Sequence, residues 1–229
     1  MTPIILIPGM MCDERMWGGF NAPPRHLIHA LPTAHDSMQD FAAAILKDAP
    51  ERFALAGLSM GGIVAMEILK QAPQRVERLA LLDTNPLVED VLTKARRNLH
   101  IAKVRNGQLE KVLREDMKPN YLAAGPNKKA ILDLCMDMAL KLGPEVFLQQ
   151  AKALRDRPDQ TETLAAFKGP ALVLMGEDDR LCPRDRHELM HALMPQSKFA
   201  IIASAGHLPP LENPDTTFAH LHNWLSTPE

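Results

Sequence analysis

Short runs of consecutive apolar residues recur along the chain and are bounded by Pro, Gly or charged residues. Runs of this length without polar alternation are typical of strands buried on both faces. They predict strands at residues 3–7, 52–57, 76–83, 170–176 and 198–204, with a weaker one at 25–31.

The segments between these runs carry apolar residues at helical spacing. Ser37 is placed to cap one helix, because Asp40 follows three positions later, as in a capping box. Residues 61–72 are apolar on nearly every side and predict a buried helix that ends at Pro73. Strands that alternate with helices predict an α/β fold, with a parallel sheet covered on both faces. The other expected helices are 184–194 and 214–225, the latter capped by Asn213.

One long segment interrupts this alternation. From about residue 88 to residue 167 the chain is rich in Leu, Ala and charged residues and is punctuated by Gly and Pro. We expect four or five short helices there and no strand, so that a helical cap (88–167) is inserted into a core formed by residues 1–87 and 168–229. Ligands bind at the carboxyl ends of strands in open parallel sheets, so the residues after each strand are the first candidates for chemistry.

Composition excludes several classes of protein. The 229 residues carry a net charge of -2, so we expect neither a nucleic-acid partner nor a membrane partner. Cys12, Cys135 and Cys182 are too few and too scattered for a disulfide framework, which favours a reducing compartment, the cytoplasm. No apolar stretch approaches the ~20 residues of a membrane span. No cofactor-binding motif is recognised, and we expect no cofactor.

The stretch RHELMHALMP, residues 186–195, fits the H-E-x-x-H zinc-protease signature. On a helix, His187 and His191 would face the same way, with Glu188 as general base. A third ligand is not evident, and Pro195 ends the helix. We therefore expect no metal site and treat both histidines as partly exposed surface residues, with a zinc metalloprotease as a remote alternative.

A stronger motif follows the strand at 52–57. GLSMGG, residues 57–62, is G-x-S-x-G, which is typical of a strand that turns at once into a helix. Small residues must flank such a corner, and Gly57, Gly61 and Gly62 supply them. Ser59 would then present its hydroxyl at a helix N-terminus, as a nucleophile that needs a base.

Residues after other strands offer the remaining groups of a serine hydrolase. His207 follows the last expected strand and is the candidate base. Asp178 and Asp179 follow the strand at 170–176, and Asp83 follows the strand at 76–83, so three acids are available to orient the imidazole.

Two backbone N–H groups must also stabilise the oxyanion of a tetrahedral intermediate. Met60 follows the nucleophile and is one candidate. The other lies in the loop after the first strand, where Met10 is the first choice and Met11 the alternative.

Together these motifs resemble the α/β-hydrolase superfamily, in its esterase, lactonase and haloperoxidase-like branch with a small helical cap. The resemblance covers nearly the whole chain. GEDDRLCP resembles the acid loop and assigns the acid to Asp179, and AGHLPPLENP resembles the histidine loop. The chain departs from the family in carrying Pro8-Gly9 where His-Gly is usual, and it begins directly with the oxyanion strand. We therefore expect about six parallel strands, not eight.

The resemblance implies the chemistry. A serine nucleophile argues against dehalogenases and epoxide hydrolases of this fold, which use aspartate. We expect an enzyme that cleaves a small or medium carboxylic ester, lactone or thioester through an acyl-enzyme on Ser59. A non-catalytic or very slow ligand-binding relative of the same fold is the alternative.

The methionines near the catalytic loops suggest where substrate binds. Met10, Met11 and Met60 are expected to line the mouth of the cleft and make it apolar, since methionine adapts to varied ligands. Met11 and Trp17 are the expected substrate contacts. A small or medium uncharged acyl group would suit such a cleft better than a charged one.

Overall fold

The computed structural model describes residues 1–227, and its centre is a six-stranded sheet. All neighbouring strands are parallel, in the order β2-β1-β3-β4-β5-β6. The strands are β1 (Ile4–Ile7), β2 (Leu27–His29), β3 (Phe53–Leu58), β4 (Val76–Leu82), β5 (Ala171–Gly176) and β6 (Lys198–Ile202). The prediction of six parallel strands is confirmed, because each apolar run forms a strand.

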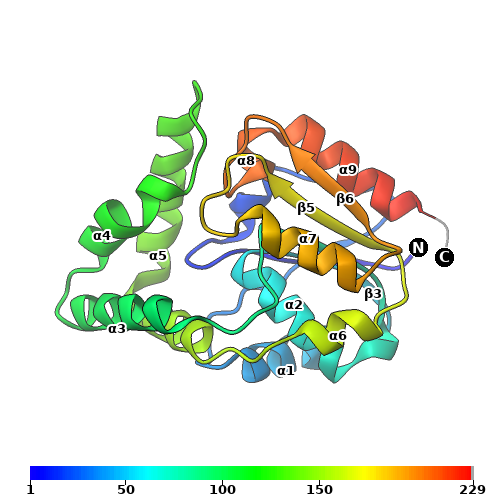
Figure 1. Ribbon diagram of the computed structural model, residues 1–229, viewed down its shortest axis with the longest axis horizontal. Helices are drawn as coiled ribbons and strands as arrows, with labels where there is room; N and C mark the ends of the chain where they lie inside the picture. Colours follow the sequence, from blue (N-terminus) through cyan, green and yellow to red (C-terminus); the bar gives the residue numbers. More distant parts are fainter. Residues whose placement is uncertain (228–229) are drawn as a thin grey trace.

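Both faces of the sheet are buried. In β1, Ile5 and Ile7 belong to one core cluster, while Ile4 and Leu6 belong to the other. The first cluster includes residues of α1 (Met38–Asp48), α2 (Met60–Gln71) and α7 (Arg184–Leu193). The second includes residues of α9 (Pro214–Ser226), and α7 and α9 lie on opposite sides of β5 and β6 (Figure 1). Burial on both sides explains why the strands carry no polar alternation.

Local sequence sets the ends of these helices. Ser37 Oγ accepts a hydrogen bond from the Asp40 N–H at 3.1 Å and donates to Asp40 Oδ2 at 2.6 Å, so Ser37 caps α1 as expected. Asn213 stands at the start of α9, but its side chain does not cap the helix. Its Nδ2 instead donates to the Ala203 carbonyl at 3.1 Å, so the expected Asn213 cap is wrong.

Helices connect β4 to β5 in the part of the chain that was expected to form a cap. α3 and the first part of α5 stand together on the side toward which β5 and β6 point (Figure 1). As expected, no strand forms between residues 88 and 167, and α5, though 28 residues long, is two helices that meet at a kink at Gly143, where φ is 81°. The segment contains α3 (Val91–Arg105), α4 (Leu109–Lys111), the π-helix η3 (Val112–Met117), the 3-10 turn η4 (Lys118–Asn120), α5 (Lys128–Arg155) and α6 (Thr161–Ala166).

Three short elements complete the chain. They are the 3-10 helices η1 (Glu14–Trp17) and η2 (Pro73–Arg75), and the single turn α8 (Pro209–Glu212). Among residues 1–227, no helix is both long enough and apolar enough to cross a bilayer.

The strand order determines where a site can form. β2 lies on one side of β1, and β3 and all later strands lie on the other side. The strand order therefore reverses at β1. The loops after β1 and β3 diverge at this point and leave a crevice at the carboxyl ends of the strands. The expected oxyanion loop and Ser59 both lie at this switch point.

Candidate active site

Ser59 occupies the corner between β3 and α2 in a strained conformation. Its φ is 55° and its ψ is -117°, a combination that L-residues rarely adopt. The turn is tight enough that only glycine fits beside it: a Cβ on Gly57 would lie 2.3 Å from the Gly61 carbonyl oxygen, and one on Gly61 would lie 2.1 Å from the Ile7 oxygen. The G-x-S-x-G spacing is therefore a steric requirement of this corner.

Hydrogen bonds from β4 and the residues after it hold the corner in place. The Ser59 N–H donates to the Leu82 carbonyl at 2.9 Å, and Thr84 Oγ1 donates to the Ser59 carbonyl at 2.7 Å. Thr84 is fully buried and also packs where a Cβ on Gly62 would clash. Sequence reasoning did not select Thr84, because a threonine after a strand carries no distinctive pattern.

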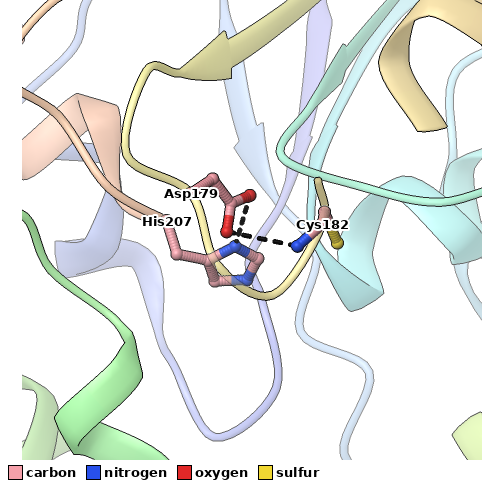
Figure 2. A group of neighbouring side chains, drawn as sticks. All are labelled: Asp179, Cys182 and His207. Carbon is pink, nitrogen blue, oxygen red and sulfur yellow. Dashed lines mark hydrogen bonds and ion pairs between the residues drawn. The ribbon is translucent and has the colours of Figure 1, made fainter. Parts of the chain in front are cut away.

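His207 and Asp179 reach Ser59 from the loops after β6 and β5. His207 Nε2 lies 2.9 Å from Ser59 Oγ, and His207 Nδ1 lies 2.9 Å from Asp179 Oδ2. The Leu181 and Cys182 N–H groups donate to Asp179 Oδ1 at 2.8 and 3.2 Å. Figure 2 shows the carboxylate between the imidazole and the Cys182 backbone nitrogen. The arrangement fixes the ring with Nε2 toward the serine.

The environment of Asp179 favours its ionised form. Burial by itself would raise the pKa of this carboxyl, but the charge and hydrogen bond of His207 and the two backbone N–H groups outweigh it, so the pKa is lowered. Asp178 is exposed, and its backbone N–H donates to the Ala205 carbonyl at 2.9 Å. Of the two aspartates in this loop, the structure therefore brings Asp179 to His207.

Asp83, the third candidate acid, is fully buried behind Asp179. Its Oδ1 accepts a hydrogen bond from the Gly176 N–H at 2.8 Å, and its Oδ2 has no hydrogen-bond partner within residues 1–227. Burial, and then the neighbouring charge of Asp179, raise the pKa of Asp83 well above its usual value. Of the two neighbouring carboxyls, Asp83 is thus the one that holds a proton more readily.

The loop after β1 offers one N–H group toward the site. The Gly9 N–H donates to Met16 Sδ at 3.3 Å, and the Met11 N–H donates to Gln150 Oε1 at 2.8 Å. The Met10 and Met60 N–H groups have no hydrogen-bond acceptor within residues 1–227. Met10 therefore fits the second oxyanion donor better than Met11, and Gln150 orders the loop from α5.

Two of the expected substrate contacts do not reach the site. Met11 has no exposed surface and Trp17 has 1%, and both belong to the hydrophobic core. Of the three methionines expected at the mouth of the cleft, Met10 lines the cavity, while Met60 and Met11 are not among its lining residues. Met11 and Trp17 are hydrophobic because they pack in the core, not because they contact a substrate.

Comparison with known protein families identifies the family of this chain. The sequence model described as the alpha/beta hydrolase family matches residues 4–221. The chain belongs to the alpha/beta hydrolase family. Its six-stranded parallel sheet and the corner at Ser59 agree with the resemblance seen in the sequence.

Solved structures of similar fold include esterases and a lactonase. A malate-bound thermophilic esterase from Thermogutta terrifontis is 27% identical with a TM-score of 0.86, over 98% of this chain and 89% of that one. The enol-lactonase from Burkholderia xenovorans LB400 is 18% identical with a TM-score of 0.86, over 99% of this chain and 92% of that one, and shows the fold alone. The family and these neighbours support hydrolase activity.

A curated relative is an uncharacterised hydrolase, YugF, from Bacillus subtilis (strain 168). It is 24% identical over 175 residues, which is 75% of this chain. The match spans 64% of the length of YugF. YugF therefore supports the family of this chain and says nothing of what this chain acts on.

The protein has a cavity of about 640 Å³ above Ser59 and His207. Met10 and Ile63 line it from the core, and most of the remaining lining residues come from the segment between β4 and β5. Four arginines line the cavity: Arg96, Arg97 and Arg157 come from this segment, and Arg186 comes from α7. The cavity therefore combines apolar side chains with charged ones, and of the three methionines expected at its mouth Met10 alone is among the lining residues.

Glu212 joins the histidine loop to the segment over the cavity, and sequence reasoning missed it. Its carboxylate accepts hydrogen bonds from the N–H groups of Ala123, Gly206 and Leu208 at 2.8, 2.9 and 2.9 Å. The His207 N–H donates in turn to the Tyr121 carbonyl at 2.7 Å. The acid was visible in AGHLPPLENP, and two of its partners lie in the same stretch, but Ala123, the partner that connects it to the cavity wall, is 89 residues away in the chain.

In the part of the chain that the structure describes, two groups of side chains have the spacing to hold a metal ion. Asp179, Cys182 and His207 form one, and Asp83, Asp179 and His187 form the other, with ligand atoms within 4.8 Å of one another in each. Both include Asp179, which already accepts hydrogen bonds from the His207 ring and two backbone N–H groups. An ion at either place would compete with the Ser59–His207–Asp179 chain.

The H-E-x-x-H residues do not converge on one point. His187 Nδ1 lies 3.3 Å from the Pro183 carbonyl, His191 Nδ1 lies 2.8 Å from Ser197 Oγ, and Glu188 pairs with Arg184 at 2.7 Å. Within residues 1–227, no group of metal-type ligands contains both histidines. His187 is fully buried, so the expectation that it lies on the surface is wrong. It packs inward because α7 covers β5.

Proposed function

We propose that this protein is a serine hydrolase that cleaves a carboxylic ester, lactone or thioester through an acyl-enzyme on Ser59. The observation that carries the proposal is the hydrogen-bonded chain Ser59–His207–Asp179, with both links at 2.9 Å, at the base of the cavity. A nucleophile, a base and a group that orients the base are the minimum that acyl transfer needs.

The first half of the reaction transfers the acyl group to the enzyme. Ser59 Oγ attacks the carbonyl carbon, its proton passes to His207 Nε2, and the carbonyl electron pair moves onto oxygen. The Met10 and Met60 N–H groups donate to this oxyanion, and the N-terminus of α2 adds its dipole. The intermediate collapses, and the leaving oxygen or sulfur takes the proton from Nε2.

The second half releases the acid. A water molecule replaces the leaving group, gives its proton to His207 Nε2 and attacks the acyl carbon. The second tetrahedral intermediate collapses with return of the proton to Ser59. Asp179 remains ionised throughout, because it holds the Nδ1–H and stabilises the imidazolium.

Hydrolysis of short para-nitrophenyl esters by the wild type and by Ser59→Ala tests the proposal. We expect kcat to fall by at least about a thousandfold in the variant, because removal of the nucleophile leaves only binding and oxyanion stabilisation. The KM should change little. Equal turnover by both proteins would contradict the proposal, and ligand binding without turnover by the wild type would favour a non-catalytic relative.

A further inference from the structure

The wall of the cavity contains two arginines that share one buried carboxylate. Glu89 lies just before α3, Arg97 lies on α3, and Arg157 follows α5. Arg97 Nε donates to Glu89 Oε2 at 2.9 Å, and Arg157 Nη1 donates to Glu89 Oε1 at 3.0 Å. The side chains of Glu89 and Arg157 are 1% and 8% exposed. Two cations against one anion leave a surplus positive charge in a place where water is scarce.

Each guanidinium keeps an unused donor. Arg157 Nε donates to the Leu87 carbonyl at 2.8 Å, and its Nη2 has no acceptor within residues 1–227. Arg97 Nη1 has only Met10 Sδ, at 3.8 Å. Neither nitrogen is among the fully buried atoms that lack a partner in residues 1–227, and both arginines line the cavity, so these donors are open to a ligand there. An oxyanion is the ligand that guanidinium donors bind most strongly.

The other acids of the cavity do not neutralise the surplus. Asp90 and Asp159 are exposed and accept hydrogen bonds from Thr93 and Thr161 at the starts of helices. Asp116 pairs with Lys103 at 2.7 Å. The interior of the cavity is therefore more positive than its rim.

The arginine pair lies close to the reacting groups. Arg97 contacts Met10, whose N–H is the proposed oxyanion donor, and both arginines line the same cavity as Ser59 and His207. A substrate held at Ser59 would extend along this wall. The two arginines are therefore placed to bind a charged group elsewhere on the substrate, and not the oxyanion that forms from the scissile carbonyl.

We infer that Arg97 and Arg157 bind a carboxylate on the substrate, so that the enzyme selects anionic esters over uncharged ones. This inference rests on the proposed function. It names the substrate class as a hemiester or lactone that carries a free carboxylate, and it replaces the uncharged acyl group expected from the methionines.

Matched esters test the selection. Para-nitrophenyl hydrogen glutarate and its methyl ester differ by one charge on the acyl side, and para-acetoxybenzoate and its methyl ester differ by one charge on the alcohol side. We expect kcat/KM to favour the anionic member of at least one pair by roughly tenfold to a hundredfold, after correction for hydroxide-catalysed rates. The pair that responds tells which side of the ester faces Arg97 and Arg157.

Variants attribute the selection to the arginines. Arg157→Met leaves Glu89 with Arg97 as a one-to-one pair and should reduce the ratio to within about threefold of unity, because the surplus charge is gone. Arg96→Met removes the same charge from an exposed lining residue that does not contact Glu89, and it should keep most of the ratio. A ratio near unity in the wild type, or a ratio unchanged in Arg157→Met, would overturn the inference.

Binding separates this inference from the proposed function. Calorimetry with glutarate and the Ser59→Ala protein should detect binding that Arg157→Met weakens by about tenfold or more. If no ester is cleaved but glutarate binding depends on Arg157, the proposed function fails and the anion site stands. If esters are cleaved without charge selection and glutarate does not bind, the anion site fails and the proposed function stands.

Discussion

Two carboxyl groups lie behind His207, and their pKa values are shifted in opposite directions. Asp179 accepts hydrogen bonds from the imidazole and from two backbone N–H groups, and its pKa is lowered. Asp83 is buried with one unpartnered oxygen, and its pKa is raised. Two ionised carboxylates so close together would repel each other, so one of them remains protonated.

The pair yields a prediction at single residues. Asp179→Asn should lower kcat by about three to four orders of magnitude, because His207 loses the partner that fixes its tautomer and stabilises its charged form. Asp83→Asn should keep kcat within about tenfold of the wild type, because a neutral amide replaces a neutral acid. Steady-state kinetics of the two variants provide the measurement. Equal damage by both changes would contradict the assignment of the acid.

His187 makes stability depend on pH. Burial, despite the attraction of Asp179, lowers the pKa of His187 from 6.5 to about 4. The unfolded chain therefore binds a proton at this site at a higher pH than the folded protein does, and stability is lost as pH falls from about 6.5 toward 4. Between about pH 7.5 and about pH 5, His187 should lower the free energy of unfolding by roughly 2 kcal/mol.

Urea unfolding of the wild type and His187→Gln at these two pH values measures the effect. The free energy of unfolding of the wild type should fall more than that of the variant, by roughly 2 kcal/mol. Parallel losses in the two proteins would show that His187 does not cause the dependence.

At the scale of elements, Glu212 on α8 holds three segments together. Its carboxylate accepts hydrogen bonds from the N–H groups of Gly206 and Leu208, on either side of His207. It also accepts one from the N–H of Ala123, which lies between η4 and α5. This single acid fixes the height of the imidazole above Ser59 and ties the cavity wall to the core.

Glu212→Ala should therefore impair both stability and turnover. We expect a loss of roughly 3 kcal/mol in the free energy of unfolding, because three N–H groups lose a charged acceptor. We also expect kcat to fall by about tenfold to a hundredfold as the His207 loop loosens. Glu188→Ala is a matched control, since its exposed pair with Arg184 contributes only about 0.3–0.5 kcal/mol. Similar losses in both variants would contradict the role of Glu212.

The elements that could be predicted are those whose sequence is constrained locally. Every strand was visible as an apolar run, and the elbow was visible because the contacts of Gly57 and Gly61 exclude any side chain. The break within α5 was also visible, because Gly143-Pro144 indicates the end of a helix and Gly143 adopts a φ of 81° through which a helix cannot continue. The roles of Glu212 and Arg157 were not visible, since both depend on partners distant in the sequence.

For the whole molecule, the order of strands places the parts of the site. The loops after β1 and β3 diverge at the switch point, the loops after β5 and β6 bring Asp179 and His207 to it, and the helices between β4 and β5 cover it. The sequence predicted this arrangement because ends of parallel strands meet at one edge of the sheet. Which side chains would face the cavity depended on packing of the inserted helices, and Met11 and Trp17 turned out to lie in the core.

The proposed function depends on Ser59 being an activated nucleophile. The most direct test treats the folded protein with a fluorophosphonate, with and without EDTA, and reads the product by intact mass and peptide mapping. We predict one adduct, on Ser59, formed equally in both samples and absent from Ser59→Ala and strongly slowed in Asp179→Asn. No adduct on folded protein, or an adduct elsewhere in the chain, would contradict the account.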